Sequence, residues 1–276
     1  MAAAVGVAAV DFPVVAVADL AADRRVAAAP AAVGSTEKEK MKPEQLVEQL
    51  KAAMPDGLRS VVLYGSAATG DHLASKSDYN ILIVADRLGL AELNALSKTA
   101  VAWAKAGNRP PLLFTPQQLR ESAVAFPIEL SDMQQSRKIL FGEDLLADIA
   151  FLPEHLRLEL ERELKARLLL VREHYMMSQG KPRLVAELLT SSLTSFLVLF
   201  RATLRLYQAD VPARKLDALG ALAKQIGFDA QVFLTIQELK EGRRKLREVS
   251  PIALFETYLK TIEQIVDAVN RRGRIS

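Results

Sequence analysis

The stretch from Val61 to Val84 reads VVLYGSAATGDHLASKSDYNILIV. An apolar run, Val61 to Tyr64, ends at Gly65-Ser66, and a second apolar run, Ile81 to Val84, follows a polar connection. Apolar runs rich in β-branched residues, bounded by glycine and small polar residues, are typical of β-strands. The stretch therefore predicts two successive strands joined by a connection that opens with a glycine turn.

Polar side chains stand at the start of the second strand. In an extended chain, alternate residues point to the same face, so Asp78 and Asn80 are expected to project together while Tyr79 points away. Mg²⁺ prefers oxygen ligands, and both side chains offer oxygen. Asp78 and Asn80 are therefore the candidate metal ligands of this chain.

The order of Gly-Ser turn, connection and Ser-Asp at the start of the next strand resembles the polymerase-beta-type nucleotidyltransferase superfamily. Aminoglycoside nucleotidyltransferases and minimal nucleotidyltransferase antitoxins are among its members. The resemblance implies that Gly65 and Ser66 hold the triphosphate of a nucleotide, with Lys76 adding a positive charge. It also implies that Asp78 and Asn80 form the catalytic centre and bind Mg²⁺.

The sequence departs from the usual pattern of that superfamily, which has an Asp-x-Asp pair and a third carboxylate on a later strand. Asn80 stands at the second Asp, and the next candidate strand, Pro111 to Thr115, contains no acid. Glu129 and Asp132 follow in segments that look helical or irregular, where capping or surface roles are expected. Their reach to Asp78 decides whether a third carboxylate exists.

These observations lead to one primary expectation and two alternatives. The first is Mg²⁺-dependent transfer of a nucleotidyl group from a nucleoside triphosphate to a hydroxyl acceptor on a small molecule or a protein. The second, favoured by Asn80 and the strand without an acid, is a catalytically degenerate protein of the same fold that binds a nucleotide or a partner. The third is an interaction protein without a nucleotide site.

The composition limits the chemistry that is available. Half of the 276 residues are hydrophobic, a quarter are charged and the net charge is +3, values typical of a globular protein without membrane segments. The absence of cysteine excludes disulfides, thiol catalysis and thiolate zinc sites, and we expect a cytoplasmic location. His72, His155 and His174 have no zinc spacing, although His72 is close enough to the motif to contact a nucleotide.

The first forty residues are dominated by alanine and valine and end in a charged run. We expect a disordered leader over 1–40 or a start of the protein at Met41, because Lys42-Pro43-Glu44 is a typical helix start. A strand over Val5 to Val17 that joins the sheet is the competing interpretation.

The second half of the chain predicts helices only. Leu152, Leu156, Leu160, Leu164 and Leu168 form an i, i+4 stripe. Further helices are expected over Arg183–Gln208, Ala213–Ile226, Ala230–Glu241 and Pro251–Arg271. The predicted fold is α/β (α+β), with a small mixed-sheet nucleotidyltransferase-like domain over 41–142 and an all-α helical bundle over 143–276.

Two sequence features bear on partners. The basic clusters from Lys240 to Arg247 and from Arg271 to Arg274 lack interleaved aromatic residues, so a solvated surface is expected and nucleic-acid binding is not. The most apolar stretch, Leu188 to Phe200, is shorter than the roughly 20 residues needed to cross a bilayer, and we expect a buried helix there.

Overall fold

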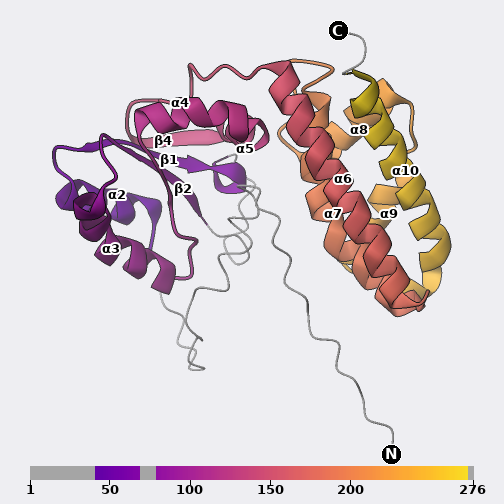
Figure 1. The fold of residues 1–276 in the computed structure, drawn as a ribbon. Helices are drawn as coiled ribbons and strands as arrows, with labels where there is room; N and C mark the ends of the chain where they lie inside the picture. Colours follow the sequence, from indigo (N-terminus) through magenta and orange to yellow (C-terminus); the bar gives the residue numbers. More distant parts are fainter. Residues whose placement is uncertain (1–40, 69–78, 273–276) are drawn as a thin grey trace, which may run out of the picture. The chain divides into compact units, whose positions relative to one another are not determined.

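The computed structural model describes residues 41–68 and 79–272, with the side chain of Ser66 excepted. The predicted leader over 1–40 and its alternative, a strand over Val5 to Val17, lie outside these residues. In chain order the elements are α2 (Pro43–Ala53), β1 (Leu58–Tyr64), the 3-10 turn η2 (Gly65–Ala67), β2 (Asn80–Ala85), α3 (Leu90–Lys105), β3 (Leu112–Phe114), α4 (Pro116–Ala125), α5 (Pro127–Gln135), β4 (Arg137–Gly142), α6 (Pro153–Ser178), α7 (Pro182–Leu204), α8 (Lys215–Ile226), α9 (Gln231–Lys240), η3 (Leu246–Glu248) and α10 (Pro251–Arg272) (Figure 1).

Two compact units contain these elements. The sheet unit comprises 41–63, 79–115 and 139–143, and the helical unit comprises 64–68, 116–138 and 144–272. Helices α4 and α5, together with the turn at Gly65, thus belong to the unit that contains the long helices. The expected fold class, a small α/β sheet domain with a helical region, is confirmed.

The sheet has four strands in the order β3-β2-β1-β4. β2 and β3 are parallel, with Leu82 opposite Leu112, and α3 connects them. The N–H of Asp86, just after β2, donates to the carbonyl of Gly57, just before β1, at 2.9 Å. The two neighbouring strands therefore run antiparallel, so the end of β1 and the start of β2 lie at the same edge of the sheet.

Strand β4 pairs with β1 and was not anticipated from the sequence. It ends at Gly142, whose φ of +75° favours glycine, and a Cβ there would lie 1.9 Å from the carbonyl oxygen of Arg59. The hydroxyl of Ser60 donates to the carbonyl of Glu143 at 2.7 Å. Close approach of two backbones is thus the reason for glycine at the end of β4.

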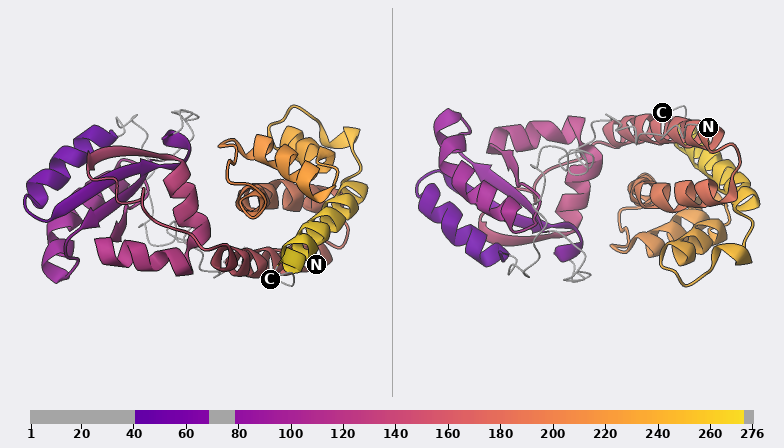
Figure 2. Two further views of the ribbon diagram at one scale, coloured as in Figure 1. Left: turned by 90° about the horizontal axis from the view of Figure 1, so that it is seen from above. Right: turned by 90° about the horizontal axis from the view of Figure 1, so that it is seen from below.

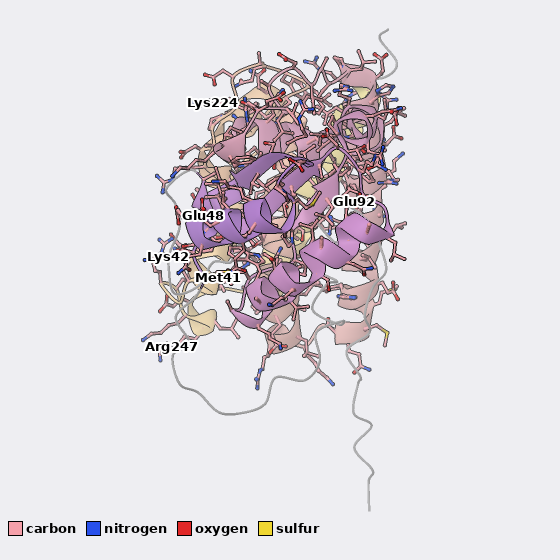
Figure 3. All side chains as sticks on the ribbon, turned by 90° about the vertical axis from the view of Figure 1, so that its left-hand side faces the viewer. Met41, Lys42, Glu48, Glu92, Lys224 and Arg247 are labelled. Carbon is pink, nitrogen blue, oxygen red and sulfur yellow. The ribbon has the colours of Figure 1, made fainter. Side chains whose placement is uncertain are left out.

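Helices α2 and α3 pack against each other beside the sheet (Figure 2). Pro43 occupies the first turn of α2, as predicted, and Leu46 and Leu50 are buried while Glu48 is exposed on its outer side (Figure 3). The fully buried Trp103 of α3 donates from Nε1 to the carbonyl of Arg109 at 2.8 Å. Burial of an indole together with its N–H partner fixes the end of α3 on the sheet unit.

In the helical unit, α6 packs against α7 and α10, and α7 also contacts α8 and α9 (Figures 1 and 2). The predicted leucine stripe on α6 is buried from Leu156 to Leu168, but Leu152 is the N-cap residue and is half exposed. The helices of this unit end near the predicted positions, except that α7 ends at Leu204 and not at the predicted Gln208. Packing of apolar faces is the main source of stability of such helices.

Helix α7 is the most apolar helix. With 23 residues, this helix is long and apolar enough to cross a membrane, judged by length and composition alone. The sequence analysis underestimated the length of the apolar segment, because it considered only Leu188 to Phe200. In the structure Leu189, Leu193 and Phe200 are fully buried, and Phe200 meets Phe233 of α9 edge to face at 5.1 Å between ring centroids. The packing is that of a central core helix.

Candidate functional site

The glycine turn after β1 has a specific anchor. Gly65 has φ of +77°, a conformation that side chains rarely tolerate, and its N–H donates to the carbonyl of Ser136 at 2.9 Å. The turn closes with a hydrogen bond from the N–H of Ala68 to the carbonyl of Gly65 at 3.0 Å. Of the two predicted phosphate-binding residues, Gly65 thus lies in the kind of tight turn that was expected, and Ser66 follows it in η2.

Asn80 begins β2, at the sheet edge where β1 ends. The ring of its neighbour Tyr79 lies 6.1 Å from that of Trp103 on α3. Because alternate residues of an extended chain point to opposite faces, Asn80 projects away from the face that α3 covers. The side chain is half-buried and has no hydrogen-bond partner within residues 41–68 and 79–272.

Three predicted site residues lie outside the described residues: Lys76, Asp78 and His72. The roles assigned to Asp78 and Lys76 therefore stay predictions. The part of the chain that the structure describes contains no cluster of three or more carboxylates and histidines able to hold a metal ion. Strand β3 consists of Leu112, Leu113 and Phe114, as expected, and supplies no acid.

The two carboxylates considered as a third ligand have partners in the helical unit. Asp132 of α5 forms ion pairs with Arg201 of α7 and with Arg205, one turn further on, each at 2.5 Å. Glu129 is buried and interacts electrostatically with Glu159 of α6. Asp132 is thus paired with arginines of the α7 region, and Glu129 lies near a like charge on α6.

Asp132 is outnumbered by the cations around it. Arg201 also donates to the carbonyl of Ala213 at 2.6 Å, and Arg205 donates to Oε1 of Gln135 at 2.8 Å. The Nε of Arg201 and the Nη1 of Arg205 are nevertheless buried without a hydrogen-bond partner in the described residues. Such donors are costly to bury unless an acceptor reaches them.

A third cation, Lys215, belongs to the same place. It is the first residue of α8 and is half-buried, and it has no ion pair with any residue of the described ranges. Burial lowers the pKa of Lys215, and the neighbouring Arg201 lowers it further, while Asp132 opposes the shift. We call Arg201, Arg205 and Lys215 the basic cluster. It holds three cations around a single carboxylate.

Helix α5 joins the basic cluster to the glycine turn. The N–H of Ser136, at its C-terminal end, donates to the carbonyl of Asp132 at 3.0 Å, and the carbonyl of Ser136 accepts the N–H of Gly65. One turn of helix, roughly 5.4 Å, thus separates the carboxylate that holds the two arginines from the residue that holds the turn. Both lie in the helical unit.

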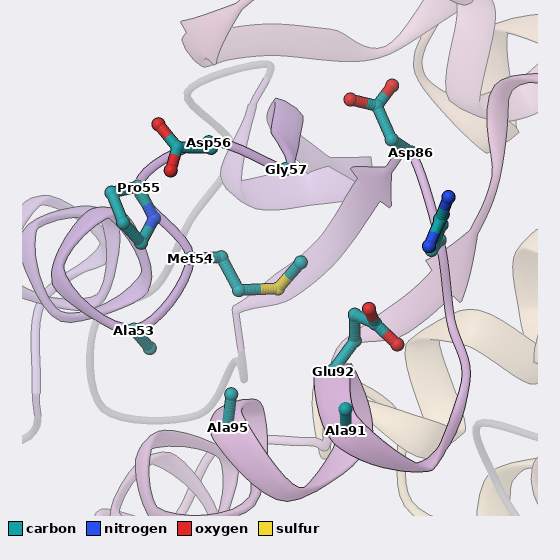
Figure 4. A pocket seen from close by; sticks show the side chains of 10 residues that line it. Ala53, Met54, Pro55, Asp56, Gly57, Asp86, Ala91, Glu92 and Ala95 are labelled. Carbon is teal, nitrogen blue, oxygen red and sulfur yellow. The ribbon is translucent and has the colours of Figure 1, made fainter.

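A pocket of about 430 Å³ lies in the sheet unit, at the other ends of β1 and β2 (Figure 4). Asp56, Asp86 and Glu92 give it an acidic rim, and Met54 and Ala95 are part of its apolar lining. Asp86 is paired with Arg59 at 3.2 Å, and Glu92 accepts the N–H of Gly89 at 2.9 Å. This pocket is remote along the strands from the predicted site.

Known proteins match this chain in structure only. No protein-family model matches the chain, and no curated protein matches it. Solved structures do match it, among them the following one. Spectinomycin adenyltransferase AAD(9) from Enterococcus faecialis, with ATP and spectinomycin, is 12% identical, with a TM-score of 0.46 over 84% of this chain and 99% of that chain. A similarity at this level does not show what the chain described here does.

The basic cluster was missed by the sequence interpretation, which considered only cations near the motif or in runs. Arg201 of α7 and Arg205, the C-cap residue of that helix, are spaced i, i+4, and Lys215 follows Arg214 at a helix start. A cation at a helix N-terminus is unfavourable, and an arginine within an apolar helix needs a partner. These two local conflicts were the available signals.

Proposed function

We propose that the chain is a nucleotidyltransferase-fold protein that binds a nucleoside triphosphate and transfers its nucleotidyl group to a hydroxyl acceptor in the presence of Mg²⁺. The observation that carries this proposal is the attachment of both the Gly65 turn and the basic cluster to α5. The turn offers backbone N–H groups and close approach, and the cluster offers positive charge, which together are what a triphosphate requires.

The charges support a phosphate ligand in particular. Arginine presents a planar set of donors that matches phosphate oxygens, and lysine supplies a compact charge. The N-cap residue of α8, Arg214, makes no side-chain cap, so the first N–H groups of that helix add further donors next to Lys215. An anion bound here relieves the mutual repulsion of Arg201 and Lys215.

For the metal, the chain offers Asp78 and Asn80 as ligands. One carboxylate and one neutral amide fit a weakly bound Mg²⁺, which usually keeps several waters and also binds phosphate oxygens. When bound, Mg²⁺ would neutralise charge on the reacting phosphates. The residues of the chain then position the nucleotide, and the acceptor is a hydroxyl of a small molecule or a protein.

A second candidate function is nucleotide binding without transfer. Asn80 in place of a carboxylate and the absence of an acid from β3 favour it. Loss of two anionic groups leaves less charge to hold the metal and no obvious base for the acceptor hydroxyl. The basic cluster does not distinguish the two functions, because both need the phosphates to be held.

Titration of ATP into the full chain, with and without Mg²⁺, tests the proposal. We expect binding that Lys215→Met weakens by at least about tenfold, or 1.4 kcal/mol, while Lys224→Met, an exposed lysine of the same helix, leaves it unchanged. Absence of ATP binding at millimolar concentration would contradict both functions. Pyrophosphate release with hydroxyl acceptors then separates transfer from binding, since only the transferase releases it.

A further inference from the structure

Helix α5 is held at its N-terminal end by a carboxyl group from another helix. The N–H of Ile128, in its first turn, donates to Oε2 of Glu159 on α6 at 2.9 Å. The C-terminal end of the same nine-residue helix carries Asp132 and Ser136, which hold the basic cluster and the Gly65 turn. The contact between Glu159 and Ile128 therefore fixes the element on which the proposed nucleotide site depends.

Glu159 is placed where a negative charge is poorly compensated. Its side chain is 5% exposed, and its second oxygen, Oε1, is buried without a hydrogen-bond partner within residues 41–68 and 79–272. The nearest cation is Arg162 at 3.9 Å, but this arginine is exposed and lies closer to Glu163, at 3.1 Å. A buried carboxylate with so weak a counter-charge is costly.

The charged groups that face Glu159 come from two helices. Glu129 of α5 and Glu163 of α6 are like charges, and Arg162 is the opposing one. On the other helices that pack on α6, Glu121 of α4 accepts from Gln117, Arg201 of α7 pairs with Asp132, and Glu263 of α10 pairs with Arg172. Two carboxyl groups thus meet at the junction of α5 and α6, with Arg162 as the opposing charge on Glu159, while Arg167 of α6 pairs with Glu163 at 3.6 Å.

We propose that Glu159 carries a proton when α5 is in the position described, and that loss of this proton to solvent releases the N-terminal end of α5 and weakens anion binding at the basic cluster. The second half of this statement rests on the proposed function. The first half does not. A neutral carboxyl accepts the Ile128 N–H and can donate its own proton, whereas two neighbouring carboxylates repel each other across the contact.

The ionisation behaviour agrees with this geometry. Burial, and after it the neighbouring Glu129, raise the pKa of Glu159 to about 8. The hydrogen bond from Ile128 opposes the shift but is outweighed. The change in protonation therefore falls just above neutral pH.

Hydrogen exchange of the backbone N–H groups of 127–136 tests the first half. Unmodified protein is compared with Glu159→Gln at pH 7 and at pH 9, because comparison at one pH cancels the intrinsic pH dependence of exchange. We expect the ratio of the exchange rate of the unmodified protein to that of Glu159→Gln to be at least about fivefold larger at pH 9 than at pH 7, because the proton is lost from the closed state in this range. Glu173→Gln, the same change at an exposed position of α6, should behave as the unmodified protein.

A ratio of the two exchange rates that is the same at pH 7 and at pH 9 would overturn the inference. A second variant, Glu129→Gln, keeps the test decisive if Glu159→Gln does not fold. Because Glu129 raises the pKa of Glu159, its replacement should move the midpoint of the pH-dependent change in exchange to lower pH. An unchanged midpoint would contradict the inferred coupling between Glu129 and Glu159.

Titration of ATP at the same two pH values tests the second half. The unmodified protein should lose at least about fivefold more affinity between pH 7 and pH 9 than Glu159→Gln does. Parallel losses in the two proteins would overturn the link to the binding site. If exchange responds to Glu159 but ATP binds at neither pH, the proposed function fails while the coupling of Glu159 to α5 stands.

Discussion

Arg201 of α7 donates from Nη2 to Oδ2 of Asp132 on α5. This pair joins two helices whose residues are 69 positions apart in the chain, and Arg205 pairs with the other oxygen of the same carboxylate. Side-chain exposures of 11% for Arg201 and 17% for Asp132 place the contact largely out of solvent. One carboxylate thus orients two arginines that would otherwise repel each other.

Asp132→Asn should destabilise the protein by about 3 kcal/mol, because it leaves two buried guanidinium groups without a counter-charge. Urea unfolding measures the change. The exposed Asp148 is a matched control, and Asp148→Asn should stay within about 0.5 kcal/mol of the unmodified protein. If both substitutions have similarly small effects, the charges of Arg201 and Arg205 are compensated by groups other than Asp132.

Lys215→Met should raise the free energy of unfolding, by about 0.5–1 kcal/mol, in the absence of any nucleotide. The substitution removes a half-buried charge that faces Arg201 at a helix N-terminus and keeps the apolar stem. Thermal unfolding measures it, with Lys224→Met as the control. If the Lys215→Met protein is more stable but has lost ATP binding, Lys215 has a functional role. If the variant is less stable, Lys215 contributes to the stability of the fold.

Asn80→Asp should strengthen the binding of Mg²⁺ in the presence of a non-hydrolysable ATP analogue by at least about tenfold, or 1.4 kcal/mol. The reason is that it places a carboxylate at the first residue of β2, two positions after the proposed ligand Asp78. Metal titration followed by calorimetry measures the change, with Asp78→Ala as the negative control. Unchanged affinity would place the metal, or the nucleotide, away from β2.

Gly142→Ala should destabilise the protein by more than 2 kcal/mol, because the new Cβ meets the Arg59 carbonyl at 1.9 Å and φ is +75°. Gly107→Ala separates the two causes. Gly107 has φ of +84° but open space around it, so only the conformational cost, about 1 kcal/mol, is expected there. Equal costs in urea unfolding would mean that β4 moves away from β1 at no penalty.

The stability of the unmodified protein should fall as pH rises from about 5 to about 8. The pKa of Glu159 is about 8 in the folded protein and 4.5 for an ordinary glutamate, so the folded state binds the additional proton in this range. The contribution is complete below the lower pKa and is lost as pH rises through the higher one. Glu159→Gln should flatten the dependence of the melting temperature on pH, and an equally steep profile in that variant would assign the effect to another group.

Local patterns were sufficient for most of the elements. The apolar runs at Val61 to Tyr64 and Ile81 to Val84 indicated β1 and β2, Pro43 indicated the start of α2, and the leucine spacing indicated α6. Strand β4 was not predicted because its sequence, RKILFG, is short and partly charged. Its extended conformation depends on pairing with β1. The metal ligand Asp78, inferred from the motif, lies outside the described residues and stays a prediction.

By itself the sequence determined which segments are helices and strands and placed a Gly-Ser turn before an Asp-x-Asn start of a strand, because periodicity and turn chemistry are properties of neighbouring residues. Only the tertiary structure decided which charges meet. Asp132 is far from Arg201 and Lys215 in the chain, and no local pattern shows that these charges meet at α5, the helix whose end also holds the Gly65 turn. The buried pair of Glu129 and Glu159 likewise exists only because α5 packs on α6, where exclusion of water makes two carboxyl groups share one environment.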